Sequence, residues 1–193
     1  MVAPSLIFCD CGCFLMSSSS LTFHIGDKVV YPNHGVGIIE QISSRTTGVA
    51  IEQFYLLKIK ASSLKVMVPF HNAATVGLRR VVRNGEVQKI LDFMTEHLSP
   101  STADWKDRFK ENSERMRTGS LLEVAAVMKN LVLLSQGKSL SFREKKMLER
   151  ARYLLVSELA MSKNVEETVV EDLLSEAMAK AKLQFPAAVS FEA

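Results

Sequence analysis

Apolar and polar side chains alternate with a period of two through residues 23–70, a pattern typical of β-strands. The segments KVVYP, GVGIIEQIS, IEQFYLLKIKA and LKVMVPF are rich in β-branched and aromatic residues, and Gly, Pro, Asn and Ser separate them. The last clear strand should end at Pro69, because proline cannot donate to a strand ladder. Within QFYLLKIKA the pattern places two sets of side chains on opposite faces, Phe54, Leu56, Lys58 and Lys60 on one and Tyr55, Leu57 and Ile59 on the other.

From about residue 84 the apolar period becomes that of an α-helix, beginning with a short helix that must end before Pro100. The segments DWKDRFKENSERMR and LLEVAAVMKNLVLLSQ follow, and Gly119 and Gly137 should end them. Further along the chain, two N-terminal capping boxes are predicted by the same spacing of a short polar residue and a glutamate. They pair Ser141 with Glu144 and Asn164 with Glu167.

These patterns predict an α+β chain with two domains. Residues 21–80 should form a small Tudor-like or SH3-like β-barrel, and residues 84–182 a bundle of four or five helices. Residues 183–193 are expected to be a tail. Residues 1–20 are expected to be an extension that is disordered or lies upstream of the true start, with Met16 as the alternative initiator.

Charge is unevenly distributed along the chain, although the formal net charge is only +3. Residues 77–160 carry 16 basic and 11 acidic side chains, whereas residues 161–193 carry 3 basic and 6 acidic ones. A basic middle segment favours a polyanionic partner such as DNA. No apolar run approaches the roughly 20 residues of a membrane span, and no signal peptide is recognised, so we expect a cytoplasmic protein without a membrane partner.

Catalytic and cofactor motifs are not convincing in this sequence. SQGKS at residues 135–139 has Val132 where a phosphate-binding loop needs its first glycine, and it follows a helix. Cys9, Cys11 and Cys13 alternate without the spacing of a structural zinc site. The four histidines show no ligand spacing, and GVG at residues 35–37 lacks the rest of a dinucleotide fingerprint. We therefore expect no enzyme, metal, cofactor or small-molecule substrate.

The helix that begins near residue 105 carries an apolar stripe beside a basic row. At about 100° per residue, Trp105 shares its stripe with Phe109, Asn112 and Met116, which favours a buried tryptophan but leaves an exposed one open. Basic rows run along this helix and a later one, and each taken alone is more typical of a solvated face. The first row consists of Lys106, Lys110 and Arg117. Together the rows indicate a DNA-binding surface, and the residues we assign to it are Trp105, Lys106, Arg108, Lys110, Arg143, Lys146 and Arg150.

Long segments of the chain resemble the CarD family of bacterial transcription regulators, also called CdnL. FHIGDKVVYPNHGVGIIEQISSR and KIKASSLKVMVPFHNAATVGLRRVV resemble the first domain of that family. ADWKDRFKENSERMRTGSLLEVAAVMKNL and LSFREKKMLERARYLLVSELA resemble its second domain. The similarity runs in order from about residue 23 to about residue 161, which makes it far more specific than a short motif.

This resemblance implies that the β module binds the β subunit of RNA polymerase and that the helices contact promoter DNA upstream of the melted region. A related β module occurs in transcription-repair coupling factors. Carried over by position, Trp105 is the wedge in the minor groove, Lys110 and Arg108 lie near phosphates, and Arg45 makes the polymerase contact. Some family members have a basic residue where this chain has Met67, which makes that part of the contact more apolar.

The resemblance therefore implies a transcription initiation regulator that stabilises the promoter open complex with weak sequence specificity and associates with the nucleoid. An exposed strand edge could pair with polymerase by strand addition, which needs no catalytic residue. A protein adaptor of polymerase whose helices bind no DNA remains the alternative. An enzyme is the least favoured class, and the chain is too short for a complete coupling factor.

Overall fold

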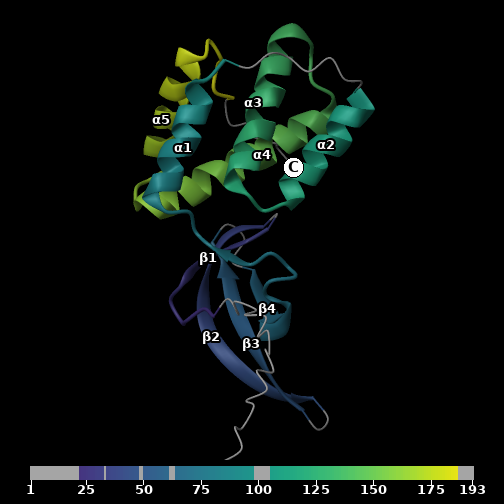
Figure 1. The fold of residues 1–193 in the computed structure, drawn as a ribbon, viewed down its shortest axis with the longest axis vertical. Coiled ribbons are helices and arrows are strands. Elements are labelled where there is room, and N and C mark those ends of the chain that lie inside the picture. The colour runs from purple at the N-terminus through teal and green to yellow at the C-terminus, as the bar shows by residue number, and fades with distance from the viewer. Residues whose placement is uncertain (1–21, 33, 48–49, 61–63, 98–104, 187–193) are drawn as a thin grey trace, which may run out of the picture.

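The computed structural model describes residues 22–32, 34–47, 50–60, 64–97 and 105–186, so the expected extension over residues 1–20 lies outside the described residues. A β module and a helical domain follow each other along the long axis of the molecule (Figure 1). The predicted α+β class, with strands first and helices second, is confirmed. No helix among the described residues is both long and apolar enough to cross a membrane.

The β module is a five-stranded antiparallel sheet with the strand order β4-β3-β2-β1-β5. Consequently β4 and the two-residue β5 form its two edges. Pro69 ends β4 as predicted, whereas β2 continues four residues beyond its last predicted position. The strands are β1 (Lys28–Tyr31), β2 (Gly35–Thr47), β3 (Ala50–Ile59), β4 (Lys65–Pro69) and β5 (Arg79–Arg80).

Tyr55 lies at the centre of the β-module core and is 1% exposed. Its ring stacks on Phe70 with centroids 3.9 Å apart, and the ring of Phe23 meets it edge-on at 5.5 Å. The Phe23 amide donates a hydrogen bond of 3.2 Å to the Tyr55 hydroxyl, so the buried phenol is satisfied. Leu57 and Ile59 are also buried, which confirms the prediction that they share one face of β3 with Tyr55.

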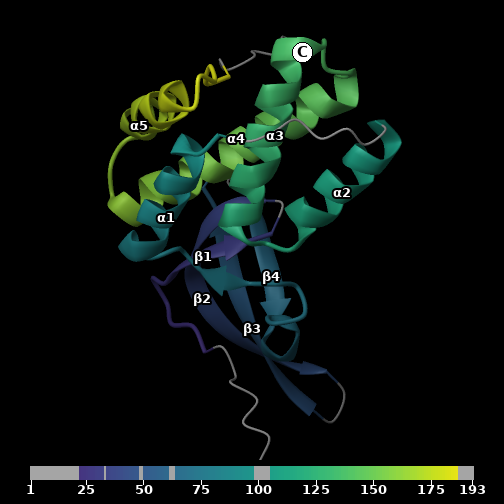
Figure 2. The same cartoon turned by 45° about the horizontal axis from the view of Figure 1, so that its top comes forward.

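Five helices form the second domain and enclose a single apolar core (Figures 1 and 2). α1 packs against α5, and α2 lies on the other side of α3. Ala181 and Leu183 are buried in this core just beyond the last helix. The helices are α1 (Asn84–Thr95), α2 (Trp105–Arg117), α3 (Leu121–Gly137), α4 (Phe142–Lys163) and α5 (Glu167–Lys180).

One of the two predicted capping boxes is confirmed, and the other is wrong. Ser141 and Glu144 exchange hydrogen bonds of 2.9 and 3.3 Å at the start of α4. Asn164 instead ends α4 in the left-handed region, with φ 55° and ψ 46°, and Glu166 precedes α5. Asparagine tolerates this conformation because its short polar side chain can bond locally, so the same residue type suits both helix ends.

An ion pair joins the two domains. The guanidinium of Arg79 on β5 donates to both carboxylate oxygens of Glu158 on α4, at 2.5 and 2.8 Å. Arg79 Nε also donates to the Gly119 carbonyl at 2.6 Å, and the Val82 amide donates to Glu158 at 3.2 Å. Glu158 is 2% exposed, so its charge is compensated entirely by these donors.

The turn between β1 and β2 presses against α4 beside this ion pair. Gly35 has φ +93°, and a Cβ atom built there would lie 3.2 Å from the Tyr153 ring. Both the conformation and the close approach require glycine. Lys28 and Ser162 add hydrogen bonds between the domains, to the Met161 and Val82 carbonyls respectively. The β module therefore meets α4 through a continuous, polar and closely packed contact.

Glu158→Gln should lower the free energy of unfolding by about 2 kcal/mol, because it leaves the Arg79 charge partly buried and uncompensated. Glu176→Gln is the matched control, since its ion pair with Lys180 is exposed and should contribute under about 0.5 kcal/mol. Urea unfolding of the full chain measures both variants. Equal losses would show that the Arg79 ion pair is no more important than a surface pair.

Candidate functional site

The faces of α2 follow the sequence prediction where its side chains are described. Asn112 and Met116 are 7% exposed and face the helical core, whereas Lys106 and Lys110 are exposed. Trp105 is the first residue of α2, and its side chain lies outside the described part of the structure. The apolar stripe and the basic row thus occupy different sides of one helix.

An open groove of about 480 Å³ lies between α2 and α4. Ser113 lines it together with apolar side chains from both helices. Four cations also line it: the basic row predicted on α4 contributes three of them, whereas the row predicted on α2 contributes Arg117 alone. Its apolar residues are Phe109, Met116 and Met147, and its cations are Arg117, Arg143, Lys146 and Arg150.

The cations of this α2/α4 groove differ from two arginines elsewhere in the domain, which form ion pairs with carboxylates. Arg115 lies 2.6 Å from Glu111, and Arg152 lies 2.5 Å from Glu171. Within the described part of the chain, none of the four groove cations forms an ion pair with a carboxylate. The groove therefore combines four cations with apolar side chains, which suits an anionic ligand.

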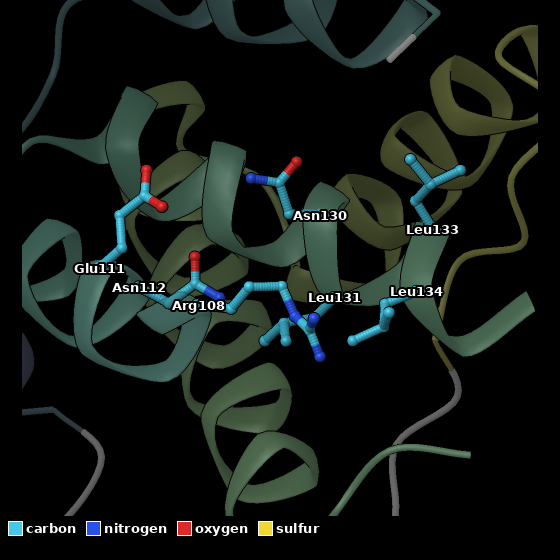
Figure 3. Close-up of a pocket in the computed structure, with 7 residues that line it drawn as sticks. All are labelled: Arg108, Glu111, Asn112, Asn130, Leu131, Leu133 and Leu134. Atoms are coloured by element: carbon cyan, nitrogen blue, oxygen red, sulfur yellow. The ribbon is translucent and has the colours of Figure 1, made fainter. Parts of the chain in front are cut away.

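Arg108 occupies a different position from the groove cations. Its side chain is 20% exposed and lies 3.8 Å from Glu144 of α4. In the close-up of a small pocket between α2 and α3, the guanidinium lies beside Leu131 and Leu134 (Figure 3). Its charge is thus already shared with a carboxylate of the protein, and its side chain is less exposed than those of Lys106 and Lys110.

The outer face of the sheet carries both residues expected at the polymerase contact. Met67 of β4 lies opposite Leu56, which lies opposite Gln41 of β2. Arg45 follows Gln41 by four residues, so it projects from the same face, and it is exposed. The strand spacing and rise place the Cα atoms of Arg45 and Met67 roughly 16 Å apart, within one protein interface.

Strand β4 borders this face and pairs on one side with β3. The described residues include no strand on its other side, which leaves backbone groups available to an additional strand. Glu40 lies between Lys58 and Lys65 at one end of the face, 3.4 and 3.0 Å away. The hydrogen bond from Lys65 is the main cause that lowers the pKa of the Glu40 carboxyl. Two lysines thus share one carboxylate at this end, whereas Leu56 and Met67 in the middle of the face are apolar.

Metal sites were not expected, and the described residues contain no group of three or more His, Cys, Asp or Glu side chains that could hold an ion. Cys9, Cys11 and Cys13 lie outside the described residues. Gly137 ends α3, as expected for SQGKS at a helix end.

Comparison with known proteins assigns each domain to a described family. Residues 23–82 match the CarD-like/TRCF RID domain, and residues 89–175 match the CarD C-terminal domain. A protein of Bacillus subtilis (strain 168), described as "Putative transcription factor YdeB", is 33% identical over 149 residues. That alignment covers 77% of this chain and 97% of the relative.

The chain belongs to the CarD family of bacterial transcription regulators. Its sheet and its helices correspond to the two matched domains, in the same order. Resemblance of long segments had already indicated this family, and the comparison confirms it.

Sequence patterns missed two features, the ion pair between the domains and an exposed aromatic residue on α4. Arg79 and Glu158 stand 79 residues apart, and neither belongs to a motif. Phe142 is 62% exposed at the start of α4, and no sequence pattern gave it a role. Its position one residue after the N-cap, outside the apolar stripe, was the available signal.

The groove should bind DNA through its phosphates, with a strong dependence on salt. Changing Arg143 and Arg150 to glutamine should reduce the slope of log affinity against log salt by up to about two units, one for each lost phosphate contact. Fluorescence anisotropy with a labelled duplex measures this slope. The matched control changes Lys138 and Lys163 to glutamine, both exposed and outside the groove. An equal change in both double variants would mean that net charge, not the groove, determines binding.

Proposed function

We propose that this CarD-family chain binds the β subunit of RNA polymerase through its β module and stabilises the promoter open complex through its helical domain. The observation that carries the proposal is the arrangement of two unlike surfaces on one connected framework. A sheet face with Leu56, Met67 and Arg45 beside the edge strand β4 lies on one domain, and a groove of four cations that form no ion pair with a described carboxylate lies on the other.

The polymerase contact is supported by the sheet edge and by the family of the β module. RID-type domains are named together with the coupling factor, and β4 offers unpaired backbone groups for strand addition. Met67 and Leu56 supply apolar area beside that edge, and Arg45 supplies a charge. Main-chain pairing would provide affinity, and these side chains would provide specificity.

The DNA contact is supported by the cations on α2 and α4. Lys106, Lys110 and the groove cations would position the domain on phosphates without reading bases. Trp105 would then insert at the upstream edge of the bubble. Insertion into an intact duplex costs a few kcal/mol of stacking, and it costs less where the stack is already broken. Such a wedge binds the open state better than the closed one, and only this difference can shift the equilibrium.

Weak DNA affinity is sufficient because the polymerase contact holds the helical domain near the bubble. A tethered second contact acts at an effective concentration that can reach the millimolar range. A differential affinity of about 1.4 kcal/mol would then change the equilibrium between closed and open complexes tenfold. The Arg79–Glu158 ion pair favours this arrangement, since it limits the volume that the helical domain explores.

Arg45→Glu should weaken polymerase binding at least several-fold while leaving DNA binding unchanged, because the charge reversal lies on the sheet face alone. Lys163→Glu produces the same change in net charge on the helical domain and is the control. A pull-down with purified polymerase measures both. Equal retention of polymerase by the two variants would remove Arg45 from the contact.

Trp105→Ala should shorten the lifetime of the open complex several-fold and leave polymerase binding intact. If the tryptophan acts on DNA, its removal should cost about 1 kcal/mol of fold stability or less. A core tryptophan would instead cost about 3 to 5 kcal/mol. Thermal melts and open-complex decay on the same variant separate these outcomes. A large drop in melting temperature would contradict the wedge.

A further inference from the structure

Phe142 is the first residue of α4 and is 62% exposed. Among the aromatic side chains that the structure describes, it alone belongs to the exposed class. The Ser141–Glu144 capping box fixes the backbone of this first turn, so the ring sits on an ordered helix end. A single exposed apolar residue is ordinary on protein surfaces and does not by itself indicate a function. The residues around Phe142 are what suggest one.

The surroundings of Phe142 are cationic. Lys146 Nζ lies 4.7 Å from the ring centroid, over the aromatic face. Lys146 also lines the α2/α4 groove with Arg143, so the ring adjoins one end of that groove. Glu144, the carboxylate in this turn, is 7% exposed and is engaged by the cap and by Arg108. An accessible ring among cations is the pattern of a stacking platform for nucleic acid.

Phe142 also lies near the start of α2. Arg108 of α2 contacts Glu144 of α4, and Met116 further along α2 lines a small cavity with Leu154 further along α4. The two helices therefore face each other with the same direction, and their first turns lie at the same end of the domain. Phe142 precedes Glu144 by two residues, only about 3 Å of helix rise.

The chemistry of this corner favours an unpaired nucleotide. Phosphates suit Arg143 and Lys146, and a planar base suits the face of Phe142. A base inside a duplex has both faces covered by its neighbours, so it cannot stack on a protein ring. An acidic peptide would satisfy the cations equally well but would gain less from a nearby aromatic ring.

We propose that Phe142 stacks on an unpaired base of melted promoter DNA, next to the position assigned to Trp105, while Arg143 and Lys146 hold the flanking phosphates. This inference rests on the proposed function and adds to it a preference for single-stranded over paired DNA at the start of α4. The chain thereby recognises the bubble by an exposed base as well as by a broken stack.

The test compares two labelled DNA probes of one sequence, a complete duplex and a fork with unpaired arms, by anisotropy with the full chain at low salt. Phe142→Ala should weaken fork binding about fivefold or more, the lower end of the contribution of base stacking, and should change duplex binding less than twofold. Phe142→Tyr should retain fork affinity because it keeps the ring. Phe142→Leu should behave like alanine because it keeps only apolar bulk.

Leu122→Ala is the matched control, since Leu122 is 43% exposed near the start of α3 and should affect neither probe. Fork binding that is unchanged in Phe142→Ala, or retained in Phe142→Leu, overturns the inference and leaves the proposed function standing. An equal loss on fork and duplex also overturns it, as does a loss of polymerase retention with unchanged DNA binding, which would indicate a protein partner. If the unaltered chain binds neither probe, the DNA part of the proposed function fails and the inference fails with it.

Discussion

The buried ion pair between Arg79 and Glu158 is the interaction on which the two-domain arrangement depends. Arg79 lies on the short edge strand β5, where the sheet ends and the helices begin, and Glu158 lies within α4. The carboxylate also accepts the Val82 amide, and the guanidinium reaches the Gly119 carbonyl between α2 and α3. One pair of side chains therefore fixes the sheet, the domain connection and three helices relative to each other.

This arrangement gives different chemistry to the two domains without separating them. The sheet offers backbone groups and apolar area, which suit a protein partner. The helices offer cations beside apolar side chains, which suit nucleic acid. A flexible linker between the domains would permit the proposed protein contact and the proposed nucleic-acid contact. The helical domain would then meet the nucleic acid in many orientations. The polar contact at α4 instead holds the helical domain in one orientation relative to the sheet.

Periodicity predicted the strands and helices well because each depends on neighbours close in sequence. The division of the β3 side chains between two faces and the cap at Ser141 follow from local spacing alone. Asn164 was assigned to the wrong helix end, because the same short side chain serves an N-cap and a left-handed C-terminus. The groove cations were predicted as rows, but their meeting depends on how α2 and α4 pack, which no local pattern encodes. The ion pair between Arg79 and Glu158 likewise depends on tertiary packing, so no local pattern predicts it.

Because α4 is long, a small rotation of the helix at the domain contact causes a large displacement at its first residue. Glu158 follows Phe142 by 16 positions on this helix, a separation of about 24 Å at the helical rise. A tilt of about 10° around Glu158 would therefore carry Phe142 about 4 Å sideways. That displacement exceeds the thickness of a base, so a small change of angle at Glu158 becomes a large displacement of Phe142. Gly35 packs against Tyr153 and Leu154 of the same helix, so a side chain there would push on α4 close to Glu158 and displace Phe142 without touching it.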